Sequence, residues 1–186
     1  MTRDFAERRA EKMRELKIKD AADGDTYAAG DLFEEFAMNY FSEIFFELID
    51  FTPRREDLHG RYCERSKYPD FRFREKMGAR EFWVECKYRR DFTDGNWIYL
   101  YEDPQKLKNL KEFREKTGNK VIFIIGVGGD PNDPQYVYLV DLDSINNNRL
   151  GLMGFLFDRL YRAYDEPFDL ESLLSSTTGA CGGRRY

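Results

Sequence analysis

Two carboxylates and a lysine lie close together around one turn of the sequence. Asp70 stands before a Met77-Gly78 turn, and Glu85 and Lys87 follow it. If the turn is a two-residue hairpin loop, Asp70 stands directly opposite Glu85. Because facing carboxylates repel each other unless a cation lies between them, this stretch predicts a site for a hard divalent ion.

The hairpin is expected to have two chemically different faces, because side chains alternate across a strand. The apolar face, predicted to join the core, consists of Phe71, Phe73, Phe82, Val84 and Cys86. The charged face consists of Asp70, Arg72, Arg74, Glu81, Trp83, Glu85 and Lys87. Lys87 therefore shares a face with both carboxylates.

Composition limits the classes of function. With 186 residues, 16% of them aromatic, the chain can bury a core of its own. A net charge of −5 argues against a protein that coats nucleic acid through bulk positive charge, although a local basic patch remains open. A single histidine, His59, excludes a multi-histidine metal site.

The compartment is expected to be the cytoplasm. The three cysteines show no CxxC spacing, which fits a reducing environment better than a disulfide framework. No apolar run approaches the ~18 residues of a membrane span, and no secretion signal is recognised, so we expect no membrane partner.

The first helix of the domain is predicted over 31–51, where apolar residues follow helical spacing. Acids cluster at its start, where the helix dipole favours them. Either Glu34 or Glu35 can instead point at the predicted site.

A second, basic helix is predicted from Pro104 to Thr117. Gln105 and Lys106, in its first turn, are candidates for contact with a phosphate. The apolar run 121–125 predicts a strand buried on both faces, and 136–140 predicts the next strand.

The remaining segments divide the chain. Helical patterns cover 152–164 and 169–174. We predict a charged N-terminal arm and linker over 1–29, a single domain over 30–174 and a flexible tail over 175–186.

The order of these motifs resembles the PD-(D/E)xK nuclease superfamily, which has the restriction-endonuclease-like fold. Tyr68-Pro69-Asp70 stands at the family's Pro-Asp position, and Glu85-Cys86-Lys87 stands at its (D/E)xK position. The segment Gly30-Asp-Leu-Phe-Glu34 matches the Gly-x-x-x-Glu of its first helix, which favours Glu34 over Glu35. The resemblance covers about residues 30–140. It implies an α/β fold with a central mixed β-sheet flanked by helices, in the order αβββαβ.

The same resemblance implies Mg²⁺-dependent phosphodiester hydrolysis, with Mn²⁺ as a substitute. Asp70, Glu85 and the backbone carbonyl of Cys86 would hold the ion, and Glu34 would reach it through a water or support a second ion. Lys87 would orient or deprotonate the attacking water.

The implied substrate is nucleic acid, with DNA favoured over RNA, cut by an endonuclease. Contacts to it are expected from Gln105, Lys106, Arg72 and Arg89. A homodimer remains open, as does a recombination or repair nuclease that acts as a dimer on branched DNA. The alternative from another class is a catalytically inactive nuclease-fold module that binds protein or nucleic acid.

Overall fold

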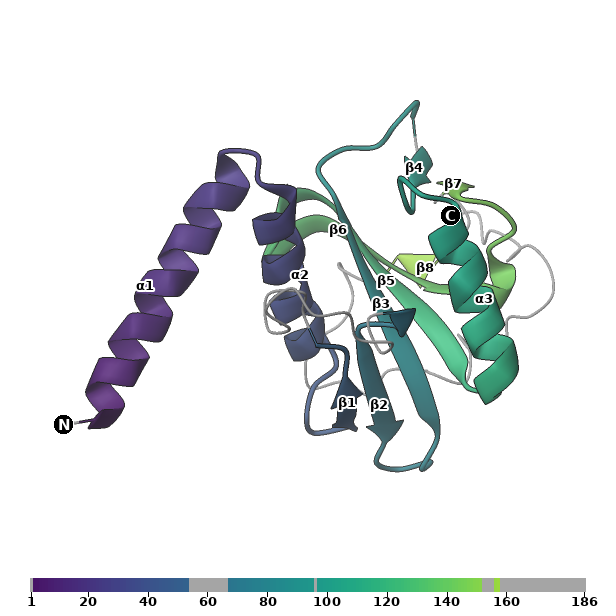
Figure 1. Cartoon of the computed structure of the whole chain (residues 1–186), viewed down its shortest axis with the longest axis horizontal. Coiled ribbons are helices and arrows are strands. Elements are labelled where there is room, and N and C mark those ends of the chain that lie inside the picture. Colours follow the sequence, from purple (N-terminus) through teal and green to yellow (C-terminus); the bar gives the residue numbers. More distant parts are fainter. Residues whose placement is uncertain (1, 54–66, 96, 152–155, 158–186) are drawn as a thin grey trace, which may run out of the picture.

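The computed structural model describes residues 2–53, 67–95, 97–151 and 156–157, and shows an α/β architecture (Figure 1). The elements along the chain are α1 (Thr2–Ala22), α2 (Thr26–Tyr40), β1 (Phe46–Phe51), β2 (Phe71–Glu75), β3 (Glu81–Arg89), β4 (Trp97–Tyr99), α3 (Gln105–Thr117), β5 (Lys120–Asp130), β6 (Asp133–Asp141), the 3-10 turn Leu142–Ser144, β7 (Arg149–Gly151) and β8 (Leu156–Phe157).

The main sheet is mixed, and its strand order is β1-β2-β3-β5-β6-β8. Neighbouring strands are antiparallel except β3 and β5, which run parallel through the centre. A parallel pair needs a crossover connection, and α3 lies within it. The predicted α/β class and the order αβββαβ are confirmed by α2, β1 to β3, α3 and β5, with the short strand β4 inserted before α3.

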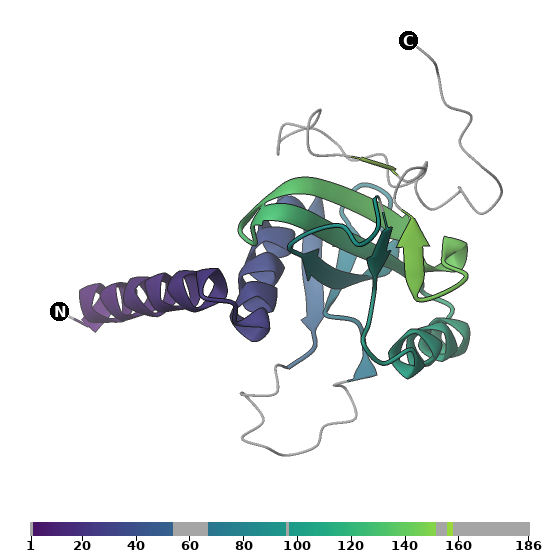
Figure 2. The ribbon, with the colours of Figure 1, turned by 90° about the horizontal axis from the view of Figure 1, so that it is seen from above.

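Helices cover both faces of the sheet, α2 on one and α3 on the other (Figures 1 and 2). The predicted apolar face of the hairpin packs against α2 as expected. This first core contains Phe33, Ala37, Tyr40, Phe41, Phe46, Phe71, Phe73, Phe82, Val84, Cys86, Ile122, Ile124, Val137 and Leu139.

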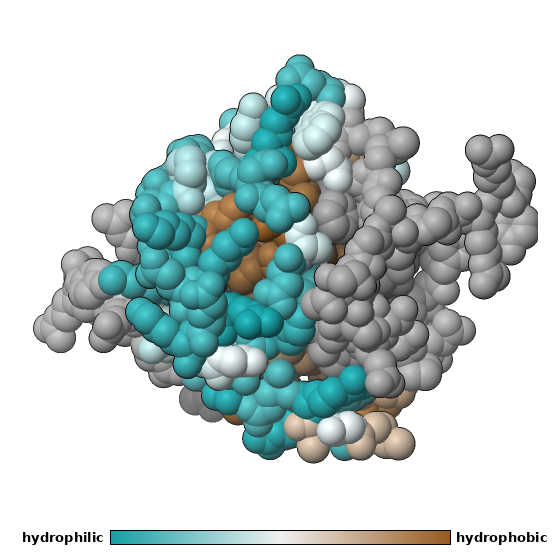
Figure 3. Space-filling model, turned by 90° about the vertical axis from the view of Figure 1, so that its right-hand side faces the viewer, coloured by the Kyte–Doolittle hydropathy of each residue, from teal (hydrophilic) through white to brown (hydrophobic). Residues whose placement is uncertain are grey.

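The second core lies under α3 and includes part of the predicted charged face. Trp83, which belongs to that face, is buried against Phe113 of α3. The exposed side of α3 is hydrophilic, and in Figure 3 hydrophilic residues surround a small apolar area. The charged face is therefore core in its middle and polar at the end that carries Asp70, Glu85 and Lys87.

The turn lies at Met77-Gly78 as predicted, but the hairpin loop has four residues, not the two that were assumed. The N–H of Glu75 donates to the carbonyl of Arg80 at 2.8 Å, and the N–H of Ala79 donates to the carbonyl of Glu75 at 2.9 Å. The register is nevertheless the predicted one, because the loop gains one residue on each side. Phe71 pairs with Val84, which leaves Asp70 and Glu85 as the next facing positions.

The helix predicted over 31–51 is wrong at both ends. It begins earlier, at Thr26, because the Asp25 side chain accepts hydrogen bonds from the N–H groups of the first turn. It ends at Tyr40, because the Ser42 carbonyl then accepts the N–H groups of Phe45 and Phe46 and turns the chain into β1. Pairing with β2 outweighs the helical spacing of the aromatic residues beyond Tyr40.

The predicted charged arm contains helix α1, which extends away from the sheet and contacts α2 (Figure 1). Lys17 pairs with Asp31 at 2.6 Å, and Arg14 pairs with Glu35 at 3.6 Å. None of the helices in the described ranges is long and apolar enough to cross a membrane.

At the C-terminal end, the helix predicted over 152–164 is wrong for Leu156–Phe157. These two residues form strand β8, which pairs with Tyr138 and Leu139 of β6. The rest of that segment, the pattern at 169–174 and the tail lie outside the described residues, as do His59, Cys63 and Cys181. The domain boundaries therefore stay a prediction.

Candidate active site

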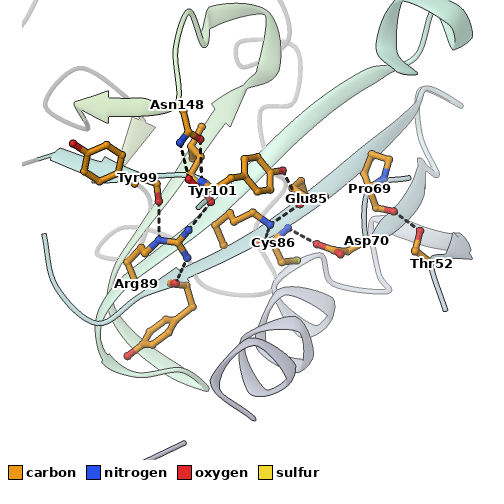
Figure 4. A network of polar contacts seen from close by, with 12 residues as sticks. Thr52, Pro69, Asp70, Glu85, Cys86, Arg89, Tyr99, Tyr101 and Asn148 are labelled. Carbon is orange, nitrogen blue, oxygen red and sulfur yellow. Dashed lines mark hydrogen bonds and ion pairs between the residues drawn. The ribbon is translucent and has the colours of Figure 1, made fainter. Parts of the chain in front are cut away.

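Asp70 is fixed immediately before the first residue of β2. Its Oδ2 accepts the backbone N–H of Cys86 at 2.7 Å (Figure 4). Its own carbonyl accepts the N–H of Thr52 at 2.8 Å, and the Thr52 hydroxyl donates to the carbonyl of Pro69 at 2.6 Å. Thr52, directly after β1, therefore anchors the Pro-Asp segment. Cys86 of β3 orients the Asp70 carboxylate.

The Asp70 carboxyl lies in an environment that opposes its ionisation. Burial raises the pKa of Asp70 well above its usual range, and the negative charge of Glu85 adds to this effect. The charge of Lys87 and the hydrogen bond from Cys86 act in the opposite direction. Any further cation placed beside Asp70 would stabilise its ionised form.

Glu85 is buried, and its Oε1 accepts two hydrogen bonds. Lys87 Nζ donates to it at 2.5 Å, and the hydroxyl of Tyr101 donates to it at 2.8 Å (Figure 4). Lys87 Nζ also donates to the carbonyl of Cys86 at 2.9 Å. The ammonium group thus contacts two of the oxygens that the resemblance assigns to a metal ion.

Lys87 keeps its proton in this arrangement. Burial alone would lower the pKa of Lys87, but the charges of Glu85 and Asp70 outweigh it and raise that pKa. The ammonium also lies 4.6 Å from the centre of the Tyr101 ring, which attracts a cation.

The oxygen atoms around Lys87 have the chemistry of a divalent-ion site. Two carboxylates and a carbonyl oxygen are the hard ligands that Mg²⁺ prefers, and the Lys87 ammonium already takes a cation's place on Glu85 and Cys86. In the described part of the chain, no group of three or more His, Cys, Asp and Glu side chains is placed to hold a metal ion. The residues therefore fit an ion that keeps several waters, not a closed protein cage.

The two acids of α2 differ in their surroundings. Glu35 pairs with Arg14 of α1 and is not among the charges that act on Asp70. Glu34 acts on Asp70 and on the Cys86 thiol, and its negative charge contributes to raising the pKa of both. This difference agrees with the choice of Glu34 over Glu35, although the role of Glu34 stays a prediction.

The carboxylates open into a cleft of about 650 Å³. Its lining includes Asp70, Glu85 and Lys87, with α2 contributing Thr26 and Tyr27. The other described residues that line it are Thr52, Lys67, Tyr68, Arg89, Leu100, Tyr101, Glu102, Asp103, Lys106, Asn109 and Leu110.

The four predicted substrate contacts divide evenly. Lys106 and Arg89 line the cleft. Gln105 and Arg72 are not among its lining residues: Gln105 donates to Asn109 of its own helix at 3.0 Å, and Arg72 pairs with Glu81 at 2.5 Å.

Arg89, although it lines the cleft, is engaged by the backbone. Its guanidinium donates to the carbonyls of Tyr88 at 2.6 Å, Tyr99 at 2.7 Å and Leu100 at 2.5 Å (Figure 4). These bonds tie the end of β3 to the segment after β4. The geometry therefore favours a clamp in Arg89 more than a contact with substrate.

Sequence reasoning missed Tyr101 and Asn148. Tyr101 belongs to the aromatic run at 97–101, which gave no sign of a role in the site. Asn148 bonds the backbone of Tyr101 from 47 positions away, and no local pattern indicates such a pairing.

Comparison with known proteins adds little to this geometry. No family model matches the chain, and no curated protein matches it significantly. Among solved structures, the Holliday junction resolvase Hjc of the archaeon Archaeoglobus fulgidus is similar, with 14% sequence identity, a TM-score of 0.44 and coverage of 66% of this chain and 88% of that chain. A likeness of this size says nothing about activity, so the fold class rests on the sheet topology.

Proposed function

We propose that this chain is a metal-dependent nuclease that hydrolyses phosphodiester bonds, with DNA favoured over RNA. One observation supports the proposal most. One cleft is lined by Asp70, Glu85 and Lys87. The Lys87 ammonium donates hydrogen bonds to Glu85 and to the Cys86 carbonyl, two groups that the resemblance assigns to the metal.

Asp70, Glu85 and the Cys86 carbonyl would hold a Mg²⁺ ion, with Glu34 contributing through a water or at a second ion. When bound, the ion supplies Lewis-acid polarisation of a phosphoryl oxygen and a water of lowered pKa. Cys86 does not contribute its thiol, because burial raises the pKa of that thiol well above its usual range.

Lys87 acts on the attacking water and on the phosphate. The pKa of Lys87 is raised by its acidic neighbours despite burial, so it is an ammonium before substrate binds. An ammonium orients water and offsets charge on the phosphoryl group in the transition state, and this role fits better than that of a base. Hydrolysis forms a P–O bond to the water oxygen and breaks the P–O bond to one of the two flanking sugar oxygens. The attacking water gives up one proton, and the departing sugar oxygen takes up one proton and leaves as a hydroxyl.

Lys106, exposed in the first turn of α3, lines the cleft and would contact a flanking phosphate. Glu102 and Asp103 line the same cleft and would repel a phosphate beside them. Lys106 lies one turn from Asp103 and would offset part of this repulsion.

A second function, a catalytically inactive binding module, is favoured by one feature of the same site. Lys87 neutralises Glu85 without any metal ion, so this carboxylate already has a counter-charge. A site that has lost its metal would show the same pairing.

The deciding experiment is a cleavage assay on labelled duplex, single-stranded and branched DNA and on RNA, in Mg²⁺, Mn²⁺ or EDTA. Wild type and Lys116→Ala, altered in the last turn of α3 outside the cleft, are expected to cut in metal alone. Asp70→Asn and Lys87→Met are expected to lose at least about a hundredfold in rate. Folded wild-type protein that cuts no substrate while binding one of them would instead support the inactive module.

A further inference from the structure

Tyr101 supplies a buried hydrogen bond to Glu85 that the proposed reaction does not account for. The residue lies in the segment between β4 and α3 and is only 8% exposed. Its hydroxyl donates to Glu85 Oε1 at 2.8 Å, and both partners are buried.

The position of Tyr101 is set by residues outside the cleft. The Asn148 side chain accepts the N–H of Tyr101 at 3.0 Å and donates to its carbonyl at 2.6 Å. The carbonyl of Asn148 also accepts the N–H of Leu100 at 2.9 Å. The ring packs edge-on against Phe123 of β5, with the ring centres 6.3 Å apart. The hydroxyl is therefore held in place independently of Glu85.

Lys87 and Tyr101 share one acceptor, and only one of them must move when a cation arrives. Lys87 Nζ donates to Glu85 Oε1 and to the Cys86 carbonyl, two of the oxygens offered to a metal. A flexible lysine can withdraw from both oxygens, and the Tyr101 ring beside its ammonium offers a surface that attracts it. The clamped hydroxyl can stay, because a carboxylate oxygen accepts more than one partner.

We propose that Tyr101 is a positioning residue, whose hydroxyl holds the Glu85 carboxylate ready for the metal ion while Lys87 leaves it. This inference rests on the proposed nuclease function. A tyrosine with only a packing role would be replaced by phenylalanine without loss at the site, and this distinguishes the two roles.

The test is metal affinity, measured by calorimetric titration of Mn²⁺ into the whole protein without substrate. Tyr101→Phe keeps the ring and removes only the hydroxyl. The matched control is Tyr99→Phe, two residues away, where the residue is 47% exposed and its carbonyl accepts from Arg89. Losing an outer partner of a metal ligand costs about 10–100-fold in affinity, and we expect this in Tyr101→Phe but not in the control.

A second variant changes the same hydrogen bond at its acceptor, Glu85. Glu85→Asp shortens the carboxylate and withdraws it from the hydroxyl without altering Tyr101. We expect weaker Mn²⁺ binding, and in this background the further change Tyr101→Phe should have little additional effect. Thermal unfolding in EDTA verifies that each variant is folded.

The outcomes separate the two proposals. The positioning role is supported if Tyr101→Phe weakens Mn²⁺ binding in the otherwise wild-type protein and has little further effect on Mn²⁺ binding in the Glu85→Asp background. Equal affinity in wild type, Tyr101→Phe and Tyr99→Phe overturns the positioning role and leaves the nuclease proposal standing. A wild-type protein that binds no Mn²⁺ and cuts no substrate overturns both.

Discussion

The backbone N–H of Cys86 donates to the side chain of Asp70, and this bond joins the two halves of the candidate site across the hairpin. β2 begins only at Phe71, so the strand cannot supply a backbone acceptor at this point. The Asp70 side chain takes its place. The carboxylate is thus part of the sheet's hydrogen bonding as well as of the cleft.

Replacing Asp70 by Asn should stabilise the metal-free protein at neutral pH. Burial, with the charge of Glu85, raises the pKa of Asp70 in the folded state well above its ordinary value of 3.8. The stabilising effect of the protonated group is therefore complete below that value and is lost as the pH rises through the folded pKa. Asn cannot ionise and can still accept from Cys86, so we expect a gain on the order of 1–2 kcal/mol at pH 7.

Urea unfolding in EDTA between pH 4 and pH 8 measures this effect. The advantage of Asp70→Asn over wild type should grow as the pH rises. Glu81→Gln is a control of opposite sign: the hydrogen bond from Arg74 lowers the pKa of Glu81, so its stabilisation exists at neutral pH and fades on acidification. Parallel pH curves for wild type and Asp70→Asn would contradict the prediction.

Lys87→Met should separate metal binding from catalysis. Removing the ammonium leaves Glu85 and Asp70 without their cation, so the metal-free protein is expected to lose about 3 kcal/mol. An added ion then relieves a larger repulsion than in wild type. We expect a larger rise in Tm with Mn²⁺ than wild type shows, together with loss of cleavage. A Tm that does not respond to Mn²⁺ in this variant would speak against a metal held by the two carboxylates.

The sequence predicted the parts of the site that depend on local patterns. Alternation in the hairpin placed Asp70 opposite Glu85 even though the loop length was wrong, because a symmetric extension of a loop preserves register. The helix end at Tyr40 was not predictable from spacing, since strand pairing with β2 decides it. The contact of Tyr101 with Glu85 depends on Asn148 and exists only in three dimensions.

Lys106 should contribute affinity for nucleic acid without sequence preference. It lines the cleft, whereas Lys108 on the same helix lies outside the lining and near Glu112. Removing one phosphate contact should weaken binding uniformly and reduce the slope of log affinity against log salt by about 0.9 on duplex DNA. Fluorescence anisotropy at several salt concentrations compares Lys106→Ala with Lys108→Ala. Equal slopes in both variants would remove Lys106 from the substrate contacts.

Gly126→Ala should loosen the packing of α2 on the sheet, and with it the position of Glu34. A Cβ at Gly126 in β5 would overlap the ring of Phe33, the residue before Glu34. Overpacking of this kind costs about 1–3 kcal/mol. The matched control is Gly30→Ala in α2, where a Cβ meets nothing within 4 Å and better helix propensity should add about 0.5–1 kcal/mol. Urea unfolding measures both changes. A free energy of unfolding that is unchanged in Gly126→Ala would mean that α2 does not pack against β5 through Phe33.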